Sequence, residues 1–244
     1  MKSDFLRTLM IGVYLLGAQA VNADPLPRDE QPKRPPVLVK LCSSVRGPEK
    51  PGQTECPGPV QRTLLIPFFV NPRPSPIELW KVTLFIFLTE EGLKFNPQVP
   101  PLQWSEFYTD TVWLQPGWPG LYASDLERFM HSVQSDPDHK YTFAWDDERD
   151  PDFRIYSALG NTQNNGYPKR LLVPKSGEAI FFQCFSPVVT DGRLLDPLCS
   201  VRDYTDSQHD GLEYMLKESR LKDWRRYSKW LWDYVDSITV RGAR

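Results

Sequence analysis

The alternation of short apolar runs with proline, glycine and charged residues predicts a sheet built from many short strands. The strands that this pattern predicts are residues 37–41, 63–66, 79–88, 141–145, 153–159, 169–173 and 179–185. Residues 79–88 start with alternation and then become continuously apolar, so we expect a central strand covered on both faces. Residues 93–119 are rich in tryptophan and proline, and we expect a packed loop layer with limited strand content there.

A capping box predicts a short helix in the middle of the chain. Ser124 and Glu127 have the Ser-x-x-Glu spacing in which each side chain satisfies a free backbone N–H of the first turn. Apolar residues follow at helical spacing, and Pro137 stops the pattern. We therefore expect a helix over about residues 125–134.

The clearest helical periodicity lies in residues 220–237. The apolar side chains near one face are Leu221, Trp224, Leu231, Val235 and Ile238, flanked by a stripe of Tyr227, Trp230 and Tyr234. Burial against the sheet explains both stripes, and in the alternative Trp230 and Tyr234 project into a partner protein. These elements predict an α+β fold, in which a mainly antiparallel sheet is packed by a short central helix and a long C-terminal amphipathic helix.

The first residues have the three parts of a secretory signal peptide. Lys2 and Arg7 precede a short apolar run, and small residues close the segment at position 23. The apolar run is far shorter than the roughly 20 residues that a membrane-spanning helix needs. We therefore expect residues 1–23 to be a cleaved signal peptide, residues 24–36 a proline-rich tether, and residues 37–244 a single globular domain without a membrane span.

Export predicts that the cysteines form disulfides, because secretory compartments are oxidising. Four cysteines allow three pairings, and we favour the local one, Cys42 with Cys56 and Cys184 with Cys199. Each pair closes a loop of about 15 residues, worth roughly 3 kcal/mol in the chain-entropy model. No Cys-x-x-Cys spacing occurs and no histidine neighbours a cysteine, so we predict no metal site.

Composition and charge argue against several classes of function. The chain has 29 Lys and Arg against 31 Asp and Glu, so a strongly basic face for nucleic acid or an anionic membrane is not expected. The Gly-x-Ser-x-Gly motif of many serine hydrolases is absent, and the paired cysteines leave no thiol nucleophile. We therefore predict no catalytic residue, no cofactor and no enzyme activity.

Two polar loops are candidates for contact with a partner. The first is an acidic cluster, whose members are Asp146, Asp147, Glu148, Asp150 and Asp152. Such carboxylates could bind Ca²⁺ or serve glycoside hydrolysis, but the cluster lacks the glycine-bearing ligand loop of an EF-hand and contains Arg149. A solvated loop is the simplest interpretation, and an acidic knob that docks on a basic cleft is the alternative. The second is the turn-rich loop 161–167, with Asn164 and Asn165.

The last 60 or so residues carry an ordered set of motifs. These are Phe182-Gln183-Cys184, Pro197-Leu198-Cys199, residues 211–216 (GLEYML), residues 221–225 (LKDWR) and Val235-Asp236-Ser237. In this order they resemble the C-terminal part of small exported immunity proteins of Gram-negative bacteria, which protect a cell against type VI secretion effectors delivered to the periplasm. In that family two cysteines flank a loop, a strand follows, and a Leu-x-x-Trp helix closes the chain.

The resemblance implies a periplasmic immunity protein that neutralises a cognate effector toxin by occluding its active site or an essential surface. It implies a toxin partner encoded next door and no catalytic machinery in the immunity protein itself. The toxin-contacting residues of the family vary, so the contact candidates Asp146–Asp152, Asn164, Asn165, Trp230 and Tyr234 rest on this sequence alone. An envelope-associated interaction protein without a toxin partner is the main alternative, followed by a carboxylate-dependent hydrolase and a small-molecule binding protein.

Overall fold

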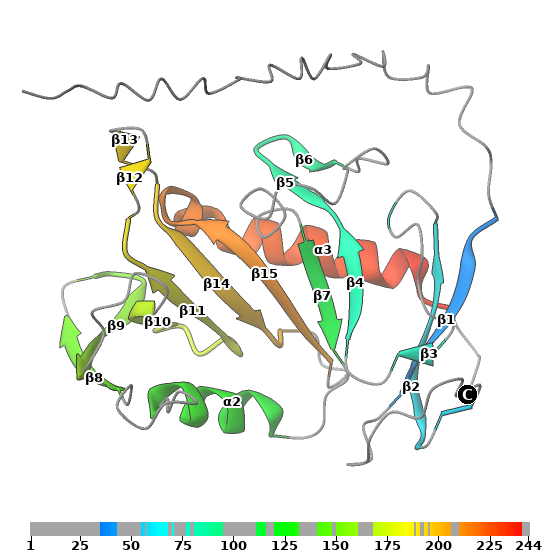
Figure 1. Cartoon of the computed structure of the whole chain (residues 1–244), viewed down its shortest axis with the longest axis horizontal. Coiled ribbons are helices and arrows are strands. Elements are labelled where there is room, and N and C mark those ends of the chain that lie inside the picture. Colours follow the sequence, from blue (N-terminus) through cyan, green and yellow to red (C-terminus); the bar gives the residue numbers. More distant parts are fainter. Residues whose placement is uncertain are drawn as a thin grey trace, which may run out of the picture. The chain divides into compact units, whose positions relative to one another are not determined.

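The computed structural model has the predicted α+β architecture, with a mostly antiparallel sheet, two helices and two disulfides (Figure 1). It describes residues 35–42, 55–56, 58–67, 70, 77–78, 81–94, 111–115, 120–131, 141–147, 150–160, 168–187, 189–190, 193–194, 196–205 and 210–240. The predicted signal peptide, and the predicted tether except for residues 35 and 36, lie outside these residues.

One sheet of eight strands forms the centre of the described fold, and every neighbouring pair in it is antiparallel. From one edge to the other its strands are β4 Val82–Phe85, β7 Thr111–Gln115, β15 Gly211–Lys217, β14 Leu198–Asp203, β11 Ile180–Phe185, β10 Pro168–Pro174, β9 Phe153–Gly160 and β8 Tyr141–Asp147. Strands β8 to β11 follow one another both in sequence and in space, which is the usual outcome of short antiparallel connections.

A second sheet of three strands is built mostly from the N-terminal part of the described chain. Strand β1 (Val37–Cys42) lies between β2 (Val60–Ile66), which is antiparallel to it, and β3 (Ile77–Glu78), which is parallel. Two short ribbons complete the strands, β5 (Phe87–Thr89) with β6 (Gly92–Lys94), and β12 (Val189–Thr190) with β13 (Arg193–Leu194).

The C-terminal helix α3 (Trp224–Ile238) packs on one face of the large sheet, as its apolar stripe predicts (Figure 1). The 3₁₀ turn η3 (Glu218–Asp223) leads directly into it, so the two form one continuous helical element. Its buried side chains include Trp224, Leu231 and Val235, which join a large core shared by both sheets. This core is where most of the apolar burial, and hence most of the hydrophobic stabilisation, is found.

Helix α2 (Leu121–Met130) packs on the opposite face of the large sheet. Successive residues of a strand point to opposite faces, so Phe182 of β11 joins the large core while its neighbour Phe181 joins a smaller core under α2. The capping box is a wrong prediction, because the helix begins at Leu121 and Ser124 lies inside its first turn, its N–H bonded to the Gly120 carbonyl. Gly120 precedes the helix with φ +84°, a left-handed conformation that glycine adopts without strain.

The apolar run 79–88 is not a central strand, which corrects the expectation drawn from its composition. Strand β4 covers only part of it, pairs with β7 alone and forms an edge of the large sheet. Val82, Leu84 and Ile86 of the run are buried in the large core, and at the edge the Phe85 N–H donates to the Val70 carbonyl at 2.8 Å. Strand β7 lies in the predicted loop layer, and the strand β14 was not expected from the alternation pattern.

Both disulfides connect the predicted partners, Cys42 with Cys56 and Cys184 with Cys199. Cys184 of β11 and Cys199 of β14 are direct cross-strand partners, so this bond joins two central strands of the large sheet. The loop that it closes contains the β12 and β13 ribbon. A covalent link at this position limits how far the two strands can separate in the unfolded chain.

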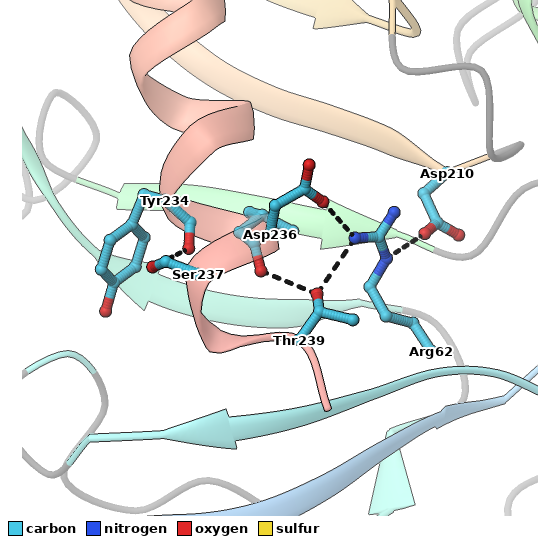
Figure 2. Close-up of polar contacts among 7 residues, drawn as sticks. Arg62, Asp210, Tyr234, Asp236, Ser237 and Thr239 are labelled. Carbon is cyan, nitrogen blue, oxygen red and sulfur yellow. Dashed lines mark hydrogen bonds and ion pairs between the residues drawn. The ribbon is translucent and has the colours of Figure 1, made fainter. Parts of the chain in front are cut away.

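A buried arginine fastens the C-terminal turn of α3 to the small sheet (Figure 2). The Arg62 guanidinium, on β2, donates to Asp210 Oδ2 at 2.6 Å, to Asp236 Oδ1 at 3.1 Å and to Thr239 Oγ1 at 3.1 Å. The backbone continues this link, since the Val240 N–H donates to the Thr63 carbonyl at 2.8 Å. Arg62 and Asp210 are almost completely buried, so each supplies the charge that the other needs away from water.

A buried aspartate fastens the middle of α3 to the large sheet. Asp203, at the end of β14, accepts hydrogen bonds from Trp232 Nε1 at 3.2 Å and from Thr205 Oγ1 at 2.7 Å. The Tyr214 hydroxyl on β15 donates to its other oxygen at 3.5 Å. The carboxylate has no exposed surface, and these uncharged donors replace the water that it loses.

Candidate protein-binding surface

The α2 face of the large sheet is only partly covered at the end formed by β8, β9 and β10. Phe143 of β8 and Leu171 of β10 are buried beneath α2. Trp145 follows Phe143 on the same face of β8, beyond the cover of the helix, and it is 45% exposed. Exposed apolar side chains are common singly, so the interest of Trp145 lies in the aromatic and cationic side chains that surround it.

A hollow of about 370 Å³ lies between α2 and these strands. Its lining comes from α2 (Tyr122, Leu126, Met130), from β9 (Arg154, Tyr156), from β10 (Val173, Pro174) and from the turn after β10 (Lys175, Gly177). The volume is at the small end of the range seen for ligand pockets, enough for one or two side chains of a partner.

Two lining residues of this hollow, Arg154 and Tyr156, also contact Trp145, which is not itself part of the lining. Trp145 and Tyr156 are cross-strand partners, and their rings meet edge to face with centres 5.5 Å apart. The Arg154 guanidinium lies over the Trp145 ring, 5.7 Å from its centre. Tryptophan, tyrosine and arginine are the residues most enriched where proteins bind one another.

Tyr122 of α2 is one of the lining residues and carries a phenol. Burial raises the pKa of this phenol, Tyr156 raises it further, and the charge of Arg154 opposes the shift. A phenol is protonated at neutral pH even at its ordinary pKa, so this hydroxyl can donate a hydrogen bond. The hollow thus combines an apolar floor with hydrogen-bond donors.

Helix α2 is held in place by a polar link to the sheet. The Tyr204 hydroxyl, beyond the end of β14, donates to the Asp125 carboxylate and accepts from Gln115 Nε2 at 3.3 Å. Arg128 forms an ion pair with the same carboxylate at 3.0 Å. Burial, and then the hydrogen bond to Asp125, raise the pKa of Tyr204 far above its usual value. The wall of the hollow that α2 supplies is therefore fixed before any partner arrives.

The predicted acidic cluster connects β8 to β9 at this end of the sheet. Asp146 and Asp147 belong to the end of β8, Asp150 and Asp152 precede β9, and Glu148 lies outside the described residues. The side chains of Asp146 and Asp147 also lie outside the described part.

The described part of this acidic loop is tied to the rim of the hollow. Asp150 Oδ1 accepts from the N–H of Asp152 at 2.9 Å and of Phe153 at 2.8 Å, which turns the chain into β9. Lys175 Nζ donates to the Asp150 carbonyl at 2.6 Å. Lys175 also lines the hollow, so this lysine joins the two features. The carboxylate of Asp150 is thus used by its own turn, while Asp152 is exposed to solvent.

The other predicted contact residues lie elsewhere in the fold. Asn164 and Asn165 lie outside the described residues, in the connection from β9 to β10.

Trp230 and Tyr234 lie on α3, on the face of the large sheet opposite the hollow. Both are partly buried and pack against the large core. Burial raises the pKa of the Tyr234 hydroxyl, as expected for a phenol held among apolar groups. Arg226 lies over the Trp230 ring, 5.2 Å from its centre. This is a second arginine on a tryptophan, remote from the first.

Sequence reasoning missed Tyr122, Arg154 and Tyr156 as members of a site. Arg154 and Tyr156 alternate along a strand that was predicted, and this alternation places both on one face. They were missed because the helix was expected to begin after Tyr122, so a helical wall opposite these strand residues was not expected. Without that wall the two strand residues belong to an ordinary exposed surface.

Within the described part of the chain, neither helix combines the length and apolarity required to cross a bilayer. No protein-family model matches this chain, and no curated protein matches it. Among solved structures it is similar to Smlt3025, an immunity protein of the Stenotrophomonas maltophilia type IV secretion system. The TM-score is 0.47 and the sequence identity 13%, over 85% of this chain and 94% of that chain. At these values the likeness carries no functional argument by itself, and the type of secretion system stays a prediction.

Proposed function

We propose that this protein is an immunity protein that binds a cognate effector toxin and neutralises it by covering the toxin's active site or an essential surface. The observation that carries the proposal is the half-exposed Trp145, with Arg154 and Tyr156, beside a hollow on a rigid scaffold. A preformed aromatic and cationic surface of this kind suits tight binding of one protein, because little ordering is needed on association.

The order of motifs that resembles exported immunity proteins supports the same function. Its cysteines link β11 to β14, and its Leu-x-x-Trp segment starts the C-terminal helical element. These residues build the scaffold, which suits a family whose contact residues vary from member to member. Recognition then depends on the surface that the scaffold presents.

The finer features of the proposal follow from the sequence. Residues 1–23 direct export to the periplasm and are removed, and residues 37–244 act as one domain behind a short tether. The toxin is a type VI effector encoded by a neighbouring gene. The acidic loop around Asp150 and Asp152 adjoins the hollow and provides a second part of the contact.

A rescue experiment tests the function. Products of the neighbouring open reading frames are exported to the periplasm one at a time, first alone and then with the full 244-residue chain. We expect one product to be lethal alone and harmless with this protein, and the two to co-purify in equal amounts. Residues 24–244 made without an export signal serve as the control and should give no protection.

Two results would contradict the proposal. If no neighbouring product is toxic, the toxin partner is wrong and the envelope-associated interaction protein becomes the better interpretation. If protection requires no complex, and instead a product of turnover accumulates, the protein acts as an enzyme.

A further inference from the structure

The charged groups that line the hollow are all cationic within the described residues. Arg154 and Lys175 contribute to its lining, and no carboxylate does. Lys175 is already bound to the Asp150 carbonyl, so its ammonium group holds the loop in place and also keeps a positive charge close by. An interior of this kind favours a negatively charged group from outside.

Arg154 is placed to bind that group. Its side chain is exposed, and no ion pair joins it to a carboxylate of the described part of the chain. The guanidinium lies 5.7 Å from the centre of the Trp145 ring, a contact that limits the positions open to this exposed side chain. Arginine binds a carboxylate through two parallel hydrogen bonds.

The floor of the hollow is apolar. Leu126 and Met130 of α2 face Val173 of β10 across it, and methionine adapts its shape to different partners. The protonated hydroxyl of Tyr122 adds a neutral donor near the cation. A group that fills this space best has an apolar body and an anionic end.

We infer that the hollow receives an acidic side chain of the toxin, bound by Arg154, together with an adjoining apolar side chain that fills the floor between α2 and β10. The inference deepens the proposed function and rests on it. The inference also says where on this surface the toxin's acidic group binds. Asp152 on the neighbouring loop would repel a carboxylate placed beside it, which directs the toxin's acidic group toward Arg154.

Charge reversal at Arg154 tests the sign of the partner's charge. The toxin identified by the rescue experiment is titrated with the wild-type full-length exported protein and with its Arg154→Gln and Arg154→Glu variants. We expect Arg154→Gln to weaken binding at least about tenfold and Arg154→Glu to weaken it more. The affinity of Arg154→Gln should also depend less on salt concentration than the affinity of wild type. Unchanged thermal melting of both variants shows that the fold is intact, as expected for an exposed side chain.

Arg226→Glu is the matched control, because Arg226 is also a part-exposed arginine over a tryptophan, but on α3. We expect this variant to bind within about twofold of wild type. Its ion pair with Asp223, at 3.4 Å, lies at the surface and contributes little to stability.

Three results overturn the inference while leaving the proposed function in place. Binding that is unchanged in both Arg154 variants removes the hollow from the interface. Binding that is stronger in Arg154→Glu shows that the partner group is basic. Binding that is lost in Arg226→Glu and kept in Arg154→Glu moves the interface to α3. If no product of the rescue experiment is toxic, the proposed function fails and the inference fails with it.

Discussion

The two faces of the eight-stranded sheet differ in how completely they are closed. On the α3 face, a long helix covers the strands, and buried polar groups fix it at its middle and at its C-terminal end. On the α2 face, a ten-residue helix packs over a smaller core whose fully buried members are Phe143, Leu171 and Phe181, among the described residues, with the hollow beside it. The difference shows that most of the apolar burial, and hence most of the stabilisation, lies on one face, while the other keeps an open hollow.

The polar links on the two faces show the same contrast. Asp203 and Arg62 on the α3 side are buried, and each has several partners among the described residues. On the α2 side, the Asp125 carboxylate is also buried, but its charged partner Arg128 is 63% exposed, and its other partner is the Tyr204 hydroxyl. Removing a buried charged partner lowers the free energy of unfolding more than removing an exposed one. Substitutions on each face therefore measure how much each face contributes to stability.

The largest effect is expected from breaking the buried ion pair of Arg62. Arg62→Met removes the guanidinium that pairs with the buried Asp210 carboxylate, which should lower the free energy of unfolding by about 3–5 kcal/mol. Urea denaturation followed by tryptophan fluorescence measures this loss. Asp236→Asn is the control, since Asp236 is 56% exposed and its replacement should cost far less. If the two variants lose the same free energy of unfolding, the buried Arg62–Asp210 pair contributes no more to stability than the exposed Asp236 contact.

A matched pair of leucines compares the two faces directly. Leu231→Ala on α3 empties a fully buried position and should cost about 2–5 kcal/mol. Leu126→Ala on α2 removes a part-exposed side chain from the wall of the hollow and should cost about 1 kcal/mol. Urea denaturation of both variants gives the two losses side by side. Similar losses would mean that the α2 face is as closed as the α3 face, and would contradict the comparison.

The smallest effect is expected at alkaline pH. Burial and Asp125 hold the pKa of Tyr204 well above its usual 10.0, so the folded protein keeps this proton while the unfolded chain releases it. The contribution to stability is complete below pH 10 and declines as the pH rises further. Tyr204→Phe should therefore reduce the alkaline loss by at most about 1.4 kcal/mol per pH unit above pH 10. Urea midpoints between pH 8 and 11.5 measure it, and parallel curves for the two proteins would refute the prediction.

Local patterns in the sequence predicted the parts of the fold that depend on neighbouring residues. The stripe of Trp224, Leu231 and Val235 predicted the buried face of α3, because helical periodicity needs no knowledge of the partner surface. Both disulfides followed from cysteine spacing within short loops. The capping box was a wrong prediction, because the Ser-x-x-Glu spacing does not show that the side chains cap a helix. The helix starts after Gly120 instead.

The candidate surface depended on contacts that no local pattern contains. Arg154 and Tyr156 were part of a predicted strand, but the hollow exists only where α2 and the turn after β10 close around them. The Arg62–Asp210 pair joins residues 148 positions apart, and the sequence offers many equally charged alternatives. Exposure and polarity drew attention to the acidic loop, which does adjoin the hollow, but they did not show the cationic lining beside it.

The link from Arg62 to residues 210–240 also sets an order of events for a chain that crosses a membrane from its N-terminus. Strand β2 emerges early, but the partners of its Arg62 side chain are Asp210, Asp236 and Thr239, near the end of the sequence. The Thr63 carbonyl likewise accepts its hydrogen bond from the late residue Val240. Contacts of such long sequence separation form late and slowly. In the exported chain that we propose, the small sheet therefore lacks its contacts with residues 210–240 until the end of the chain has crossed the membrane.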